Sequence, residues 1–179
     1  MQPRMPQPGL SQPGLPHKDL PQANMAQPKM LQPQMGRLTG GKERGEWAEL
    51  RFMARAAEEG LLVSRPFGGT ARYDVGVEFH RRHLRVQVKS TIYRKPGGAF
   101  SMRVAGAKSQ PYATGDIDFL AAYLIPLEQW YIVPWFELQT QRGPLRTLYL
   151  SPQSRQQRWH PFLEAWHLLR GEKRKAATF

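Results

Sequence analysis

The chain has 179 residues, room for one domain or for one domain with a tail. Its 26 Lys and Arg residues against 14 Asp and Glu residues give a formal charge of +12 and a pI ≈ 10.5. This balance favours a polyanionic partner, nucleic acid before an anionic membrane surface, over an ordinary charged surface. The absence of cysteine excludes disulfides and thiolate metal sites. No apolar run approaches the roughly 20 residues of a membrane span, so we expect a cytoplasmic protein without membrane attachment, nucleoid-associated in a prokaryote.

Residues 1–36 differ from the rest of the chain in composition and repeat. From Gln2 they fall into five-residue units with Met or Leu at the fourth place, and they hold eight of the 16 prolines. Prolines at this density forbid helices and central strands, so we predict a disordered tail. The tail is either a docking segment for a partner or a short repeat translated upstream of a true start at Met35. We assign residues 37–172 to one folded domain and residues 173–179 to a basic C-terminal tail.

The folded part opens with the pattern of an amphipathic helix over residues 41–60. Apolar residues recur there at steps of three and four, and Gly60 follows as a stop signal. The stripe predicted to face the core consists of Trp47, Leu50, Ala54, Ala57 and Leu61. Short apolar or alternating runs then predict four strands, at residues 61–67, 73–79, 84–90 and 99–104.

The second half of the chain is more apolar. Residues 117–126 are nearly all apolar, as expected of a strand buried on both faces, and residues 130–136 are predicted to be its hairpin partner. A closing helix is predicted to begin at Pro161 and to end at Gly171. Its apolar face would consist of Phe162, Leu163, Trp166 and Leu169. The order of helix, strands and helix predicts an α/β (α+β) domain with a mixed β-sheet flanked by helices.

The hairpin of the second and third strands carries polar side chains on one face. Asp74 lies in the first of these strands, and Gln87 and Lys89 lie in the second, each between apolar residues. With residues 80–83 as the turn, Asp74 lies directly opposite Lys89, at a Cβ separation of about 4.5–5.5 Å. The same pairing places Gly76 opposite Gln87 and leaves space beside the amide. The group is either a cross-strand ion pair on a solvated face or a site for chemistry on a phosphate.

From Gly45 to Ser90 the chain resembles the PD-(D/E)XK nuclease superfamily, whose pattern is a helix with a glutamate, a strand with an aspartate and a strand with Glu/Gln-x-Lys. The resemblance spans about residues 36–170. It is stronger to small group-I-intron-encoded homing endonucleases than to archaeal Holliday-junction resolvases, and it implies a restriction-endonuclease-like core. The motif positions are taken by Glu49, Asp74, Gln87 and Lys89. Tyr73 stands where the family motif has proline, and the neutral Gln87 removes one charge from the metal site.

The same resemblance implies a Mg²⁺ site at which Mn²⁺ can substitute. Mg²⁺ prefers hard oxygen ligands in octahedral geometry and keeps several waters. The implied ligands are the carboxylates of Asp74 and Glu49, the amide oxygen of Gln87 and the backbone carbonyl of Val88. Lys89 would orient or help deprotonate the attacking water and neutralise the scissile phosphate. Glu46 lies near the same helical face as Glu49 and ranks second as the helix carboxylate.

Together with the basic charge, the resemblance implies a metal-dependent endodeoxyribonuclease that acts on DNA rather than RNA. Cleavage of both strands, or of a junction, would need two active sites and therefore a homodimer or homotetramer. The alternative is a non-catalytic basic nucleic-acid-binding module with the same fold. The residues expected to contact nucleic acid are Arg72, Ser90, Arg94, Lys95 and Lys108. We assign Trp130, Tyr131 and Trp135 to the core or to oligomer contacts rather than to base stacking.

Overall fold

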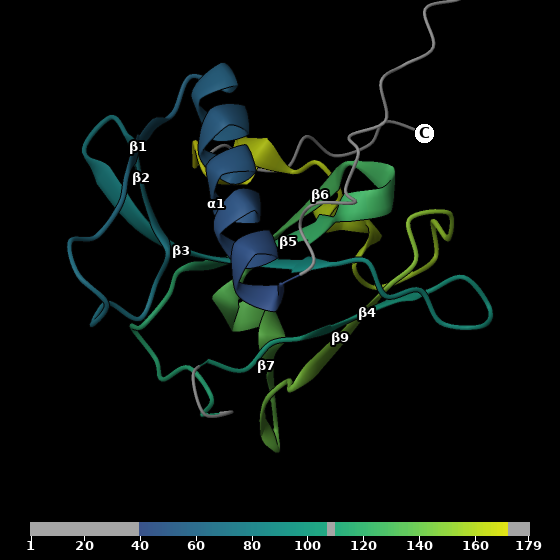
Figure 1. Cartoon of the computed structure of the whole chain (residues 1–179). Helices are drawn as coiled ribbons and strands as arrows, with labels where there is room; N and C mark the ends of the chain where they lie inside the picture. Colours follow the sequence, from purple (N-terminus) through teal and green to yellow (C-terminus); the bar gives the residue numbers. More distant parts are fainter. Residues whose placement is uncertain (1–39, 107–109, 172–179) are drawn as a thin grey trace, which may run out of the picture. The chain divides into compact units, whose positions relative to one another are not determined.

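A five-stranded mixed sheet forms the centre of the domain (Figure 1). The computed structural model describes residues 40–106 and 110–171. In sheet order the strands are β1 (Leu62–Ser64), β2 (Val75–Phe79), β3 (Arg82–Thr91), β5 (Phe119–Leu124) and β6 (Gln129–Pro134). The pairs β1–β2, β2–β3 and β5–β6 are antiparallel, and β3–β5 is parallel. The predicted α+β class with a mixed sheet is confirmed.

Different elements cover the two faces of the sheet. Helix α1 (Gly41–Glu58) packs on one face, and the strand pair β4 (Phe100–Arg103) and β9 (Thr147–Leu150) packs on the other, against β5 and β6. Side chains of β5 alternate between the two layers: Phe119, Ala121 and Tyr123 join the helix side, and Leu120, Ala122 and Leu124 join the other. This burial on both faces explains why the strand is apolar throughout, as predicted. The described residues also form the short strands β7 (Gln139–Thr140) and β8 (Gly143–Pro144) and the 3-10 helices η3 (Ile125–Leu127) and η4 (Trp135–Leu138).

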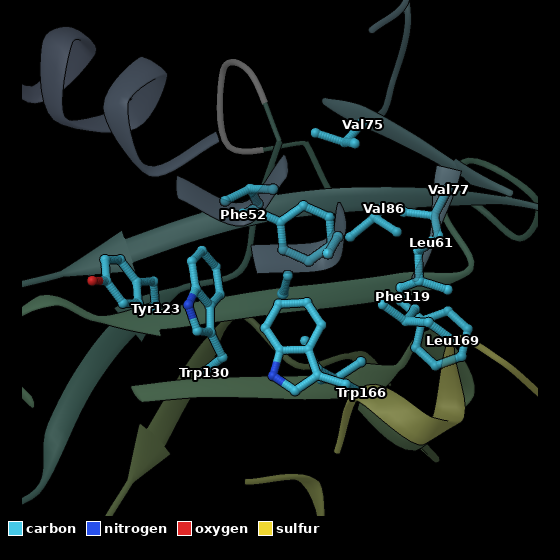
Figure 2. Close-up of a cluster of buried hydrophobic side chains, with 14 of the residues drawn as sticks. Phe52, Leu61, Val75, Val77, Val86, Phe119, Tyr123, Trp130, Trp166 and Leu169 are labelled. Carbon is cyan, nitrogen blue, oxygen red and sulfur yellow. The ribbon is translucent and has the colours of Figure 1, made fainter. Parts of the chain in front are cut away.

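The core beneath α1 is rich in aromatic side chains (Figure 2). Phe52 stacks on Trp166 with ring centroids 5.5 Å apart and meets the edge of Trp130 at the same distance. Trp130 stacks in turn on Tyr123 at 4.2 Å. Such pairs contribute about 0.5–1.5 kcal/mol each beyond the area that they bury. The aromatic residues assigned to the core from the sequence, Trp130, Tyr131 and Trp135, are all buried.

The predicted apolar face of α1 is largely wrong. The exposed positions are Leu50, Ala54 and Ala57, and the fully buried ones are Ala48, Phe52 and Ala56. Only Leu61, just after the helix, is buried as predicted, while Trp47 is half-buried. The Phe52 ring buries more apolar surface than a leucine, so the helix is rotated to direct this ring inward. The two alanines on the same face let the helix approach the sheet closely.

The turn of the β2–β3 hairpin is centred one residue earlier in the chain than predicted. Only His80 and Arg81 lie between the paired residues Phe79 and Arg82. His80 adopts the left-handed region with φ 55°, which allows a two-residue turn between antiparallel strands. The register is therefore shifted by two residues from the predicted pairing.

This shift changes the neighbours of the polar side chains. Asp74 lies beside Gln87 rather than opposite Lys89, since Val75 pairs with Val86. Gly76 does not open space beside the amide. A Cβ at Gly76 would lie 2.6 Å from the Ser64 hydroxyl, so close approach of β1 requires the glycine.

The predicted closing helix is replaced by two short 3-10 helices, η5 (His160–Phe162) and η6 (Trp166–Leu168). Between them Leu163 is extended and pairs with Tyr131 of β6, and Glu164 has a left-handed φ of 50°. This pairing gives hydrogen-bond partners to backbone groups on the outer edge of β6, which a helix in this place would leave without partners. The apolar residues also divide between the two cores: Trp166 and Leu169 join the helix side, and Phe162 and Leu163 join the other.

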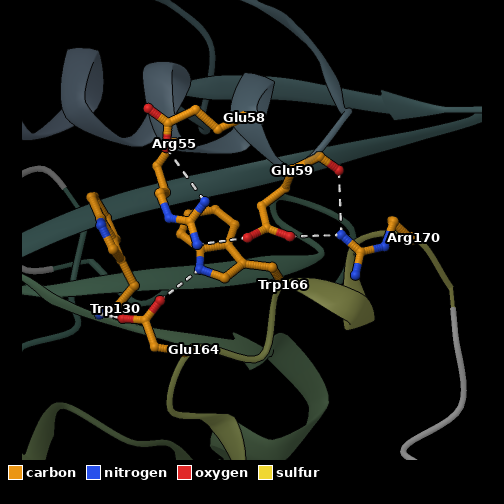
Figure 3. A network of polar contacts seen from close by, with 7 residues as sticks. All are labelled: Arg55, Glu58, Glu59, Trp130, Glu164, Trp166 and Arg170. Atoms are coloured by element: carbon orange, nitrogen blue, oxygen red, sulfur yellow. Dashed lines mark hydrogen bonds and ion pairs between the residues drawn. The ribbon is translucent and has the colours of Figure 1, made fainter. Parts of the chain in front are cut away.

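Hydrogen bonds and an ion pair tie this segment to α1 and β6 (Figure 3). The Glu164 carboxylate accepts the backbone N–H of Trp130 at 2.6 Å and the indole N–H of Trp166 at 2.8 Å. Glu59, directly after α1, pairs with Arg170 at 2.8 Å. The end of the described chain is thereby fixed to the helix and to the edge strand.

Several predictions concern residues outside the described part of the chain, namely the tail at 1–36, Lys108 and the basic segment 173–179. Within the described residues, no helix combines the length and the apolar character that crossing a membrane would require.

Candidate active site

Asp74 lies immediately before β2, at the end of its ladder with β3. Its backbone N–H donates to the carbonyl of Val86 at 3.0 Å, and its Oδ2 accepts the N–H of Val88 at 2.9 Å. If β2 continued, a backbone carbonyl would accept the Val88 N–H; here the Asp74 carboxylate accepts it instead. Oδ2 also accepts a hydrogen bond from the side-chain amide of Gln87. The backbone and the amide thus fix the orientation of the carboxylate.

Asp74, Gln87 and Lys89 lie on the wall of one cleft of about 400 Å³. The neighbouring strand residues Val86 and Val88 belong to the helix-side core, so the polar residues of β3 point to the opposite face. On that face the β4–β9 pair packs against β5 and β6, and none of its residues is among the described residues that line the cleft. Loop residues complete the wall, namely Ala71, Arg72, Gly106 and Tyr112.

Burial and neighbouring charges act in opposite directions on the Asp74 carboxyl. Burial raises the pKa of Asp74, whereas the Val88 N–H, the charge on Lys89 and the Gln87 amide lower it, with a net shift upward. The site therefore holds an anion whose burial is not fully compensated. Within the described residues, no ion pair of 4.0 Å or less joins Asp74 to Lys89. The cross-strand ion pair considered from the sequence is thus not formed.

Glu49 lies on α1, and its charge interacts with the groups of the cleft. Its side chain is 17% exposed and pairs with Arg65 at 2.7 Å. Burial, followed by the charge on Asp74, raises the pKa of Glu49, while the charges on Arg65 and Lys89 lower it. Glu49 is not among the residues that line the cleft, but it interacts electrostatically with the groups that do. Glu46, the second choice from the sequence, is exposed.

The residues predicted to contact nucleic acid lie in different places. Arg72 lines the cleft, and its Nε donates to the Asp116 carboxylate at 3.1 Å. Arg94 instead lines a separate hollow of about 430 Å³, and the Lys95 ammonium lies 4.7 Å from the centre of a tyrosine ring of β9. Ser90 is half-buried and alternates to the opposite face of β3. Among the described members of this group, only Arg72 lines the cleft.

Comparison with known proteins adds to this geometry. A family model described as PD-(D/E)XK endonuclease matches residues 39–169. The chain belongs to the PD-(D/E)XK endonuclease family. A sequence search of curated proteins found no match. Among solved structures, the bacterial homing endonuclease I-Ssp6803I is similar, with a TM-score of 0.61 and 26% identity over 74% of this chain and 94% of that chain.

The PD-(D/E)XK endonuclease resemblance seen in the sequence is therefore confirmed, whereas the roles of individual residues stay predictions. Two residues at the site of this endonuclease were missed from the sequence, Arg65 beside Glu49 and Tyr112 on the wall of the cleft. Arg65 lies in the run predicted as a strand but follows the observed end of β1 at Ser64, and Tyr112 lies in a connecting segment without a regular period. Only their tertiary contacts bring them to the site.

Asp74→Asn is expected to stabilise this PD-(D/E)XK endonuclease at neutral pH in EDTA. Because the pKa of Asp74 is raised on folding, its ionisation costs stability above the folded-state pKa, and the cost is absent below the ordinary value of 3.8. The gain in unfolding free energy should be up to about 1 kcal/mol at pH 7. It should shrink as the pH falls toward 4. Urea unfolding at both pH values measures it.

Asp118→Asn is a matched control with the opposite sign. Burial tends to raise the pKa of Asp118, but two hydrogen bonds of 3.0 Å from the Arg85 guanidinium, a third from the Arg85 backbone N–H and the Arg85 charge lower it overall. This carboxylate stabilises the fold above its ordinary pKa, and the stabilisation is lost as the pH falls. Asp118→Asn should therefore be less stable than the wild type at pH 7. If Asp74→Asn lost as much unfolding free energy as Asp118→Asn at pH 7, the burial of the Asp74 charge would not be destabilising.

Proposed function

We propose that this chain is a metal-dependent endonuclease that hydrolyses phosphodiester bonds in DNA. The observation that carries the proposal is the cleft on whose wall the Asp74 carboxylate, the Gln87 amide and the Lys89 ammonium lie together. Membership of the PD-(D/E)XK endonuclease family and the similarity to a homing endonuclease support it. The formal charge of +12 suits a polyanionic substrate.

The donor set at the cleft fits a divalent cation such as Mg²⁺, with Mn²⁺ as a substitute. Both donors to Asp74 within the described residues reach Oδ2, which leaves Oδ1 for a cation that would offset the buried charge. Gln87 directs its amide nitrogen at Asp74, so a half-turn of the amide would be needed to present its oxygen as a ligand. The Val88 carbonyl and Glu49, directly or through water, would complete the set.

This proposed site is poor in charged ligands. The described residues contain no group of three or more His, Cys, Asp or Glu side chains that could hold a metal ion. The cation would therefore rely on the Asp74 carboxylate, neutral protein oxygens and water, a donor set that Mg²⁺ accepts because it usually retains several waters.

The side chains around the cleft have distinct proposed roles. A bound Mg²⁺ would supply a Lewis acid and a more acidic water. Lys89 would orient that water and neutralise the scissile phosphate. Arg65 lowers the pKa of Glu49 and so favours its ionised form. Arg72 is anchored by Asp116 and offers its remaining N–H groups to the phosphate backbone.

DNA is proposed as the substrate, and the active species is proposed to contain more than one chain. One such cleft cleaves one phosphodiester bond at a time. Cutting both strands of a duplex, or a junction, requires two clefts, which a homodimer or homotetramer would provide.

Incubation of supercoiled plasmid with the purified protein in Mg²⁺, Mn²⁺ or EDTA tests this function. We expect nicked or linear DNA with either metal and intact plasmid in EDTA. Gel shifts without cleavage in any metal would instead favour the basic nucleic-acid-binding module. Such binding should weaken steeply with salt, because each neutralised phosphate contributes about −0.9 to the slope of log affinity against log salt.

A further inference from the structure

Tyr112 is a deeply buried polar side chain on the wall of the cleft. It is 4% exposed, yet it lines the cleft together with Asp74, Gln87 and Lys89. Its hydroxyl makes no hydrogen bond with any residue that the structure describes. The hydroxyl is not among the described side-chain atoms that are fully buried without a partner, so it reaches the surface of the cleft and is available to a ligand there.

The ring of Tyr112 is held on several sides. It meets the edge of Trp135 at 5.6 Å, and the Arg72 guanidinium lies 5.8 Å from its centre. Gly106 packs against the end of the ring that bears the hydroxyl, because a Cβ there would lie 3.3 Å from Cε1 and 3.4 Å from Cζ. Arg72 is fixed in turn by a 3.2 Å hydrogen bond to the carbonyl of Pro111, next to Tyr112. The hydroxyl is therefore positioned before any ligand binds.

Burial is the main reason why the hydroxyl stays protonated. Burial, followed by the charge on Asp74, raises the pKa of Tyr112 above its ordinary value of 10.0. At the pH of cleavage the group can donate a hydrogen bond but cannot act as a base.

We propose that the Tyr112 hydroxyl donates a hydrogen bond to a non-bridging oxygen of the phosphate that is cleaved. This inference rests on the proposed nuclease function and adds a substrate contact to it. A fixed, neutral donor stabilises charge that develops on the phosphate without any proton transfer. Lys89 on the same wall would supply the positive charge, and the hydrogen bond from Tyr112 would fix the orientation of the phosphate.

Tyr112→Phe removes the hydroxyl and keeps the packed ring. Single-turnover cleavage of a DNA that the wild type cuts should fall by at least about tenfold, with an unchanged melting temperature. Tyr131→Phe is the matched control. The Tyr131 hydroxyl is fully buried without a partner among the described residues, and Tyr131 does not line the cleft. Its removal should leave the cleavage rate unchanged.

A modified substrate tests the contact itself. A methylphosphonate at the mapped cleavage position replaces one non-bridging oxygen by a methyl group. In EDTA, the wild type should bind natural DNA about fivefold more tightly than Tyr112→Phe does, the scale of one hydrogen bond. The two proteins should bind one methylphosphonate diastereomer equally well. A purely structural role for Tyr112 predicts the same difference on both DNAs.

Gly106→Ala provides a second variant in case Tyr112→Phe folds poorly. The added Cβ would lie 3.3 Å from both the Tyr112 ring and the Gln110 carbonyl oxygen, so we expect the support of the ring to shift by a few tenths of an ångström while the hydroxyl is retained. Cleavage should fall, but by less than in Tyr112→Phe. Wild-type rates in both variants would overturn the role of Tyr112 and leave the nuclease function standing. A wild type that cuts no DNA in Mg²⁺ or Mn²⁺ would overturn both proposals.

Discussion

Asp74→Asn is expected to lower DNA cleavage by at least about 100-fold while DNA binding persists. The substitution removes the only carboxylate among the described residues that line the cleft. It keeps an oxygen that can accept the Val88 N–H, so the local ladder is retained. Binding in EDTA should be unchanged or tighter, because a negative charge near the phosphate is lost. Plasmid nicking and gel shifts with the same protein measure both effects.

Lys89→Ala should cause a loss of similar size, and the double variant should be little worse than either single one. Both side chains are proposed to serve the same water and phosphate, and residues that act as a unit are not additive. Glu78→Gln is a suitable control, since Glu78 is exposed on β2 and does not line the cleft. An Asp74→Asn protein that nicks plasmid at the wild-type rate would end the assignment of the site. Additive losses would show that Asp74 and Lys89 act independently.

Trp166→Ala is expected to lower the free energy of unfolding by about 3–5 kcal/mol. Trp166 is 2% exposed, stacks on Phe52 at 5.5 Å and lies 5.4 Å below the Arg55 guanidinium. Truncation would leave a cavity beneath α1. It would also remove the indole donor to Glu164, whose other oxygen holds the backbone of Trp130.

Urea unfolding followed by far-UV circular dichroism measures this loss without depending on the tryptophan that is removed. Phe136→Ala is the matched control, because Phe136 is 71% exposed and its removal should change stability by no more than about 0.5 kcal/mol. A loss below about 1 kcal/mol in Trp166→Ala would show that the C-terminal segment is not anchored by this ring.

The structure places Asp74, Gln87 and Lys89 together, as predicted from the sequence, although the predicted hairpin register is wrong. The observed register differs from the predicted one by two residues, and strand side chains alternate with a period of two. Asp74, Gln87 and Lys89 therefore stay on one face in either register. A shift of one residue would have separated Asp74 from the other two. The neighbour of Asp74, in contrast, depends on the exact turn, which His80 permits only through its left-handed conformation.

Other features depended on packing that no local pattern encodes. On α1, the face with Leu50 and the face with Phe52 both have apolar residues at helical spacing. Packing of Phe52 against Trp130 and Trp166 determines that its face is the buried one. The apolar spacing after Pro161 fits a helix, but the edge of β6 offers backbone partners to Leu163. Contacts with distant strands outweigh propensity in both places.

The sequence alone determines which side chains of a recognised strand share a face, because alternation is a property of neighbouring residues. Hence the apolar β5 and the polar face of β3 can both be recognised from the order of apolar and polar residues. Only the tertiary structure decides what covers each face. The β4–β9 pair buries one face of β5 and β6, while the loops that carry Arg72 and Tyr112 leave a cleft over Asp74. These contacts join segments far apart in the chain. Their energies depend on shape complementarity and burial, which the spacing of apolar residues along the chain does not predict.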